Sequence, residues 1–180
     1  NSCGRDGVFI GVGGGIVCDI TAFAASVYMR GCRLTLVPTT LLAMVDAAVG
    51  GKTGFNFAGY KNMAGTFYPA ETVLLIPETL STLPEKELLS GLAENIKHAC
   101  LGDASLFQLL KQKKREILTK KKDILTEMIR KSVAVKAGIV EKDLTEAGVR
   151  EHLNLGHTFA HALESVGNLT GSGHGEAVAW

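Results

Sequence analysis

Disulfide and thiolate chemistry have little support in this chain of 180 residues, because it holds only four cysteines. Cys3, Cys18, Cys32 and Cys100 lie far apart, and no two of them form a C-x-x-C pair. Cysteines in such a pattern are typical of buried thiols in a reducing compartment. The sequence therefore predicts neither a disulfide framework nor a cysteine-ligated metal, and it favours a cytoplasmic protein.

The chain also lacks an excess of charge of one sign and a long hydrophobic run. Its 19 basic and 18 acidic residues give a net charge of +1, whereas nucleic acids and anionic membranes attract strongly basic surfaces. The best apolar candidate for a membrane span, residues 20–29, is about half the length that crosses a bilayer. We therefore expect no nucleic-acid partner and no membrane partner.

Glycine, in contrast, is abundant: the chain has 21, and they gather in its first half. In that half, apolar runs of strand length occupy residues 8–12, 33–37 and 72–76. A glycine turn after the first run leads into residues 17–29, which have the length and composition of a helix. Thr39 or Thr40 can cap a further helix through Val45. This order of strand, glycine turn, helix and strand predicts an α/β fold with a parallel sheet and helices on its faces.

The pattern changes at Pro84, where a proline followed by two acids indicates the start of a helix. Apolar residues then recur at helical spacing in two segments: Leu88, Leu89, Leu92 and Ile96, and later Ile124, Leu125, Met128, Ile129 and Val133. We therefore expect a boundary near residue 84. It separates an α/β part, residues 1–84, from a mainly α-helical part, residues 85–180.

A basic run at residues 111–122 holds six lysines and one arginine but a single acid. A patch for nucleic acid is one interpretation, but no aromatic side chains alternate with the lysines to stack on bases. We favour a solvated helix face.

The glycines at 13–15 stand between a predicted strand and a predicted helix, where backbone N–H groups commonly hold phosphate. In a G-x-G-x-x-G pattern Cys18 replaces the third glycine, and no acid stands about 20 residues downstream to bind a ribose. A nucleotide site and a plain tight turn both stay open on these residues. Residues 50–53, Gly-Gly-Lys-Thr, are not a P-loop, because Asp46 occupies the place of its first glycine.

Three histidines lie close together near the end of the chain and suggest a metal or catalytic site. His157 and His161 share one face of a predicted helix, and His174 begins a His-Gly-Glu sequence. Glu94 and Lys97 share a face of an earlier predicted helix. Nitrogen and oxygen donors without cysteine suit Zn²⁺ or another divalent ion at a catalytic site. The metalloprotease motif H-E-x-x-H does not fit, because residue 158 is threonine; His98 and His152 we interpret as ordinary core or surface residues.

Several short blocks follow one another along almost the whole chain. They are Gly13-Gly14-Gly15 with Asp19, Arg30-Gly31, residues 38–43, Asp46 with residues 50–54, Lys61-Asn62, Leu83-Pro84, residues 91–94 with Lys97, residues 154–159 with His161, and residues 174–178. In this order and spacing they resemble the sugar-phosphate cyclase family, and within it the 3-dehydroquinate synthases. The resemblance implies a partial Rossmann-like, NAD-binding parallel sheet followed by a mainly α-helical metal-binding domain.

The resemblance also implies a role for particular residues. Glu94, His157 and His174 match the ligands of Zn²⁺ or Co²⁺. Matches to NAD-binding positions are Gly13, Gly14, Gly15, Ile16, Val17, Cys18, Asp19, Thr39, Thr40, Lys52, Lys61, Thr79, Leu80, Ser81 and Thr82. Matches to residues that hold or act on the substrate are Asp46, Asn62, Lys97, Lys136, Arg150, Asn154 and His161, and Arg30 matches one that reaches a neighbouring subunit's phosphate group.

The activity implied by the resemblance converts 3-deoxy-D-arabino-heptulosonate 7-phosphate, a phosphorylated sugar acid, to 3-dehydroquinate and phosphate. It proceeds by transient NAD oxidation, β-elimination, reduction and aldol closure, in a homodimer. The sequence departs from the family's usual residues at Cys18 and at His98, where glycine and tyrosine are common. The alternatives are another sugar-phosphate cyclase, a metal-dependent dehydrogenase of the glycerol type, and a fragment without catalytic activity.

Both ends of the chain also favour a fragment, because it begins at Asn1 without an initiator methionine and stops at Trp180 inside an apolar run. We expect these residues to form the middle half of a longer enzyme.

Overall fold

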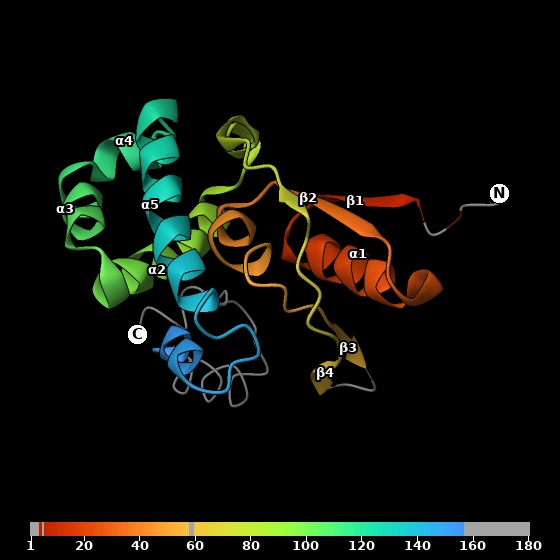
Figure 1. The fold of residues 1–180 in the computed structure, drawn as a ribbon. Helices are drawn as coiled ribbons and strands as arrows, with labels where there is room; N and C mark the ends of the chain where they lie inside the picture. The colour runs from red at the N-terminus through yellow and green to blue at the C-terminus, as the bar shows by residue number, and fades with distance from the viewer. Residues whose placement is uncertain (1–3, 5, 58–59, 157–180) are drawn as a thin grey trace.

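The computed structural model describes residue 4, residues 6–57 and residues 60–156. Figure 1 shows two groups of elements: a small sheet with one long helix beside it, and a separate cluster of helices. In the part of the chain that is described, no helix is both long and apolar enough to cross a membrane.

The sheet consists of three parallel strands in the order β1 (Val8–Gly13), β2 (Arg33–Pro38) and β5 (Thr72–Val73). β1 and β2 pair along their whole length, from Val8 opposite Arg33 to Gly13 opposite Pro38. Helix α1 (Gly15–Val27) connects them and packs on one face of the sheet (Figure 1). The predicted parallel α/β arrangement is therefore confirmed.

The core between α1 and the sheet is made of small and branched side chains. Cys18, Ala22 and Ala25 of α1 are buried against Leu34 and Leu36 of β2. Small residues on the helix let it approach the sheet closely, which favours the observed packing. This packing fixes the start of α1, and with it the glycine turn, at the carboxyl end of β1.

Two predicted boundaries differ from the structure. Helix α1 ends at Val27 rather than residue 29, because Met29 and Arg30 adopt left-handed φ angles of 50° and 67° in the short 3-10 turn η1 (Tyr28–Arg30). The third strand was predicted over residues 72–76, but β5 ends at Val73. The Leu74 N–H still donates to the Leu36 backbone oxygen over 2.8 Å, but the register places residue 75 opposite Pro38, which ends β2 and has no N–H to donate, so the ladder does not continue along residues 75–76.

Between β2 and the helices, the chain forms three shorter features. A one-turn helical segment leads into the π-helix η2 (Ala43–Ala47), whose start is capped as predicted: the Ala43 N–H donates to Thr40 Oγ1 over 3.2 Å. The hairpin β3 (Phe55–Phe57) and β4 (Tyr60–Ala64) follows, and the 3-10 helix η3 (Pro77–Thr82) precedes the long helices.

The helical part contains α2 (Glu85–Gly102), α3 (Ala104–Gln112), α4 (Lys114–Leu118), α5 (Lys122–Val140) and the 3-10 helix η4 (Val149–Asn154). α2 and α5 pack against each other, and Met44 and Val45 of η2, together with Leu41 just before it, enter the same core. The predicted apolar stripe of α5 is confirmed, since Leu125, Met128 and Ile129 are buried.

The predicted stripe of α2 is wrong in part. Leu88 is buried, but Leu89 and Ile96 are 49% and 46% exposed. The face of α2 that turns inward carries Glu94, Asn95, Lys97 and His98 in addition to apolar residues. Polar side chains occupy it because that face meets η2 and α5, where the candidate site lies.

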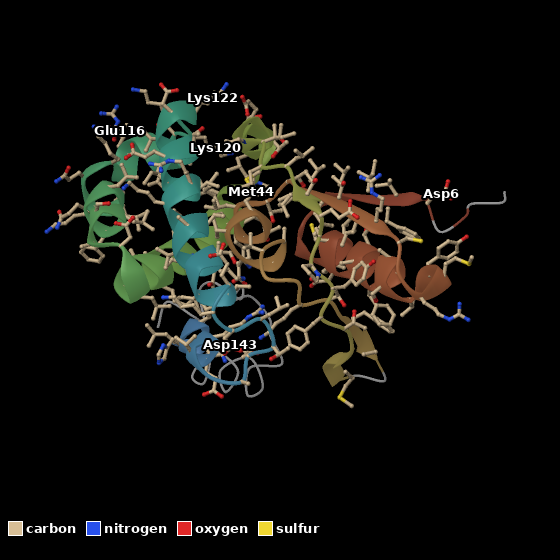
Figure 2. All side chains as sticks on the ribbon, in the orientation of Figure 1. Asp6, Met44, Glu116, Lys120, Lys122 and Asp143 are labelled. Carbon is tan, nitrogen blue, oxygen red and sulfur yellow. The ribbon has the colours of Figure 1, made fainter. Side chains whose placement is uncertain are left out.

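Two further expectations concern the cysteines and the basic run at residues 111–122. Cys18 and Cys32 are buried free thiols as predicted, but Cys100 is exposed, because it lies on the outward side of α2. In the basic run, Lys120 donates to the backbone oxygens of Ser81 and Leu83, and Lys122 pairs with Glu78 (Figure 2). These lysines therefore bind the helical part to η3, in addition to facing solvent.

Candidate active site

A cluster of charged side chains lies where η2, α2 and α5 meet; Glu94, Lys97 and Lys136 are buried, and Asp46 is partly buried. η2 supplies Asp46, and α2 supplies Glu94 and Lys97 one helical turn apart. α5 supplies Lys136, 90 residues along the chain from Asp46. The structure therefore brings together four residues that the resemblance singled out in three separate segments of the chain.

Each carboxylate of the cluster has a lysine beside it. Lys136 Nζ donates to Asp46 Oδ1 over 2.5 Å and to the Asp46 backbone oxygen over 2.6 Å. Lys97 Nζ forms an ion pair with Glu94 Oε2 within α2. Both lysines are almost fully buried, so each ammonium group relies on its carboxylate to offset the cost of losing water.

Burial and charge act in opposite directions on Asp46. Burial alone would raise the pKa of its carboxyl, but the ammonium groups of Lys136 and Lys97 hold that pKa well below its usual range. Burial, and then the negative charge of Asp46, raise the pKa of Asp19 to about 6. A charged Asp46 beside a carboxyl that titrates near neutrality is typical of a functional site.

The remaining acid and the histidine of the cluster respond mainly to burial. Burial, reinforced by the charge of Asp46, raises the pKa of Glu94 against the opposing effect of Lys97. Burial lowers the pKa of His98 to about 4, so its imidazole is neutral at physiological pH. A neutral imidazole has a lone pair that can bind a metal.

Oxygen and nitrogen donors gather closely enough here to hold a cation. One carboxylate oxygen of Asp46, one of Glu94 and one ring nitrogen of His98 lie within 4.8 Å of one another. This donor set suits Zn²⁺ or Co²⁺, so the residues present fit a divalent metal. Of the three ligands predicted from the resemblance, Glu94 stands at this point, whereas His157 and His174 lie outside the described residues, as does His161.

The predicted phosphate turn lies between β1 and α1, and its geometry suits an anion. Gly14 is the N-cap of α1, so the first N–H groups of the helix are open at this end. A Cβ atom on Gly13 would stand 2.7 Å from Val17 Cβ, and one on Gly14 would stand 3.3 Å from Thr40 Cγ2. The turn therefore needs glycine, and it leaves a cradle that backbone N–H groups face.

Other predicted NAD-binding residues lie around this turn and in η3. The Thr39 N–H donates to the Gly13 backbone oxygen over 2.8 Å, which joins the ends of β1 and β2 beneath the cradle. Ile16, Val17, Cys18 and Asp19 form the first turns of α1, and Thr79, Leu80, Ser81 and Thr82 form η3. The side chain of Lys61, on β4, lies outside the described side chains, and so does that of Asn62.

A second group of predicted residues is joined by an acid that the sequence analysis did not select. Glu146 pairs with Lys52, and its Oε1 accepts a hydrogen bond of 3.1 Å from Asn154 Nδ2. Arg150 is buried beside them; it donates to the backbone oxygens of Leu144 and Gly50 and lies over the ring of Phe67.

Asp143 holds the turn that carries Arg150, by accepting hydrogen bonds from the backbone N–H groups of Ala147, Gly148 and Arg150 (Figure 2). The turn that holds Arg150 and the loop that precedes Lys52 are therefore joined by direct contacts. Arg30 stands apart from both groups, exposed at the end of η1.

Sequence reasoning missed two parts of this arrangement. His98 was interpreted as an ordinary core or surface residue; it is a core residue, but it also lies in the charged cluster. Its spacing of four residues from Glu94 was the available signal, since such residues share a helix face. Glu146 carried no comparable signal, because its partners Lys52 and Asn154 are brought to it only by the folded chain.

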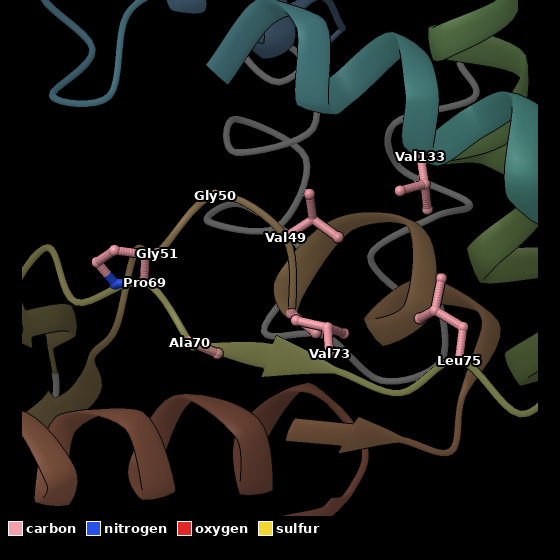
Figure 3. Close-up of a pocket in the computed structure, with 9 residues that line it drawn as sticks. Val49, Gly50, Gly51, Pro69, Ala70, Val73, Leu75 and Val133 are labelled. Carbon is pink, nitrogen blue, oxygen red and sulfur yellow. The ribbon is translucent and has the colours of Figure 1, made fainter. Parts of the chain in front are cut away.

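A hollow of about 260 Å³ lies beside these groups, and its described lining is apolar. It is lined by residues of the loop 48–51, by Pro69, Ala70, Val73 and Leu75, and by Val133 of α5 (Figure 3). None of these described lining residues is ionisable, so their side chains offer no charge for a phosphate or a carboxylate.

Solved structures with this fold include two cyclases. The 2-epi-5-epi-valiolone synthase from Streptomyces hygroscopicus, with NAD⁺ and Zn²⁺ bound, is 36% identical to this chain with a TM-score of 0.86; the match covers 94% of this chain and 47% of that one. A 2-deoxy-scyllo-inosose synthase complexed with carbaglucose-6-phosphate, NAD⁺ and Co²⁺ is 25% identical with a TM-score of 0.84, over 98% of this chain and 48% of that one. The fold is therefore that of the sugar-phosphate cyclases.

Sequence comparisons define the family more narrowly. Residues 1–90 match the model of the 3-dehydroquinate synthase N-terminal domain, and residues 91–180 match that of the C-terminal domain. The chain belongs to the 3-dehydroquinate synthase family. It is 51% identical to the 3-dehydroquinate synthase of Acidithiobacillus ferrooxidans over 98% of its own length, and 55% identical to that of Pyrococcus abyssi over 90%. It spans about half the length of these curated relatives, 48% and 47% respectively.

Proposed function

We propose that the protein containing this chain is a 3-dehydroquinate synthase, a lyase that converts 3-deoxy-D-arabino-heptulosonate 7-phosphate to 3-dehydroquinate and phosphate. The observation that carries the proposal is the buried cluster of Asp46, Glu94, Lys97 and Lys136, which lies in a chain of this family. We include in the proposal a division of the chain near residue 84, a homodimer, and a cytoplasmic location.

The two cofactors have separate places in this proposal. NAD would lie on the cradle of Gly13, Gly14 and Gly15, where the open N-terminus of α1 suits a diphosphate. Zn²⁺ or Co²⁺ would be held by Glu94 with His157 and His174. When bound, NAD supplies a reversible hydride acceptor, and the metal supplies a Lewis acid for a substrate hydroxyl.

The residues of the cluster would act on the substrate by charge. Lys97 and Lys136 lie in a dry environment, where ammonium groups attract carboxylate and phosphate groups more strongly than they do in water. Asp46 stays ionised because of its lysine, so its carboxylate can accept hydrogen bonds from substrate hydroxyls. An anionic group of the substrate that displaces Glu94 from Lys97, or Asp46 from Lys136, would form a new ion pair with that buried lysine.

The second group would bind NAD through Lys52 and a further part of the substrate through Asn154 and Arg150. Lys52 and Asn154 are both held by Glu146, which orients their polar atoms before any ligand arrives. Arg150 joins the loop at Gly50 to the turn at Leu144 and so keeps these residues at a fixed separation. Preorganised groups of this kind reduce the entropy that binding would otherwise cost.

The proposal can be tested with the complete protein, the heptulosonate phosphate, NAD and zinc. We expect release of inorganic phosphate without net formation of NADH, because the hydride returns to the substrate within each cycle. Phosphate release from a different sugar phosphate only would indicate another cyclase, and net NADH formation from a polyol would indicate a dehydrogenase. Either result would contradict the proposal.

A further inference from the structure

His98 is a buried histidine whose second ring nitrogen has no hydrogen-bond partner among the residues that the structure describes. It lies on α2, one turn after Glu94, and is 0% exposed. Its Nδ1 is 2.7 Å from the hydroxyl oxygen of Ser132 on α5. Its Nε2 is buried and makes no hydrogen bond within the described part of the chain. A buried nitrogen without a hydrogen-bond partner is unfavourable in a folded protein, so this atom is a candidate for contact with a bound ligand.

Ser132 determines which nitrogen of the ring is available. Ser132 is itself buried, and its contact with Nδ1 fixes the orientation of the imidazole between α2 and α5. When Nδ1–H donates to the serine oxygen, the proton is on Nδ1 and the lone pair is on Nε2. Histidines that bind metals are held in this way, with one nitrogen hydrogen-bonded and the other on the ion.

The surroundings of His98 supply further metal donors. One of its ring nitrogens lies within 4.8 Å of a carboxylate oxygen of Glu94 and of one of Asp46. Two donor atoms that each lie about 2.1 Å from one zinc ion are roughly 3.4 Å apart at the tetrahedral angle. They are about 4.2 Å apart when they lie on opposite sides of the ion. Small movements of side chains would therefore place His98 and Glu94 on one cation.

We propose that His98 is a protein ligand of the divalent metal, additional to Glu94, His157 and His174. The inference rests on the proposed function, because it concerns the metal of the same site. Without the metal, Lys97 and Lys136 neutralise the two carboxylates of the cluster; with it, His98 adds a neutral nitrogen donor that brings no further charge into the buried site. His98 would thereby raise metal affinity without increasing the repulsion between acids.

Cobalt provides a direct test in the complete protein. Each histidine bound to Co²⁺ gives one exchangeable, strongly shifted N–H proton resonance, so the wild type is expected to show three and the His98→Phe variant two. We also expect His98→Phe to weaken Co²⁺ binding at least tenfold, as measured by titration of the visible absorption of cobalt. His152→Phe is the matched control, because His152 is exposed on η4; it should leave both the resonances and the affinity unchanged.

The outcomes separate this inference from the proposed function. Two resonances in the wild type, with equal cobalt affinity in His98→Phe, would overturn the role of His98 and leave the metal-dependent function standing. A wild-type protein that binds no cobalt would overturn both. If His98→Phe does not fold, as judged by circular dichroism, the number of resonances in the wild type alone decides between two and three histidine ligands.

Discussion

The contact between α2 and the segment before η2 depends on one glycine, and its replacement gives a sharp prediction. A Cβ atom on Gly91 would stand 2.6 Å from the Leu42 backbone nitrogen and 2.7 Å from Leu41 Cβ and Cγ. Backbone atoms cannot move aside by changing a rotamer, so Gly91→Ala must push α2 away from residues 41–42. Gly138 on α5 is the matched control, since none of the described residues lies within 4 Å of the position of its Cβ.

The two substitutions should change stability in opposite directions. In a helix interior, alanine is favoured over glycine by about 1 kcal/mol, and this gain is expected for Gly138→Ala. At Gly91 the same gain is outweighed by an overpacking cost of up to about 3 kcal/mol, which leaves a net destabilisation of about 2 kcal/mol. Urea denaturation of both variants measures the free energies of unfolding.

A stabilised Gly91→Ala variant would refute this reasoning. It would mean that α2 does not approach residues 41–42 as closely as described, and that the separation of Asp46 from Glu94 is set elsewhere. The expected displacement of α2 should also weaken binding of a divalent metal at Glu94, whereas Gly138→Ala should not change it.

Three further predictions concern single groups. Because Lys136 holds the pKa of Asp46 well below its usual range, the stability from this pair is present above about pH 4 and is lost as the pH falls through the folded pKa. Lys136→Met should therefore cost about 3 kcal/mol of unfolding free energy at pH 7 in metal-free protein. A cost that does not shrink towards pH 3 would contradict the pairing. Asp103→Ala removes the side-chain cap of α3 and should lower the free energy of unfolding by about 1 kcal/mol in urea denaturation, whereas an unchanged midpoint would exclude the cap. Burial raises the pKa of Cys18 to about 11, whereas Cys100 is exposed. Peptide mapping after brief treatment with a thiol reagent at about pH 7.5 should therefore find the label on Cys100 and not on Cys18. Faster labelling of Cys18 than of Cys100 would be inconsistent with their burial.

The sheet could be predicted from the sequence where local pattern and long-range pairing agree. The apolar runs that became β1 and β2 have the right length, and the glycine turn between β1 and α1 has the right residues. The run at residues 72–76 has the same apolar character, but its pairing depends on a partner strand that ends at Pro38. A strand boundary set by another segment is not visible in the run itself.

The site was predictable only in its charged residues. Asp46, Glu94, Lys97 and Lys136 were selected through the resemblance, and the structure places them together. The helical periodicity of α2 was misleading in part, because Leu89 and Ile96 of the predicted stripe are exposed, whereas Leu88 is buried. The place of His98 in the charged cluster was hidden for the same reason: a helix that buries a polar face hides its polar residues from a search for apolar stripes.

If Glu94 helps to hold the divalent metal in the charged cluster, phosphate release depends on this carboxylate and on the metal. The most direct test measures phosphate release from the heptulosonate phosphate, together with bound zinc, in the complete protein and its Glu94→Gln variant. Glu127→Gln is the control, because Glu127 is exposed on α5. We predict that Glu94→Gln loses both zinc and turnover and that added zinc does not restore them, whereas Glu127→Gln keeps both. Wild-type zinc content and turnover in Glu94→Gln would contradict the account.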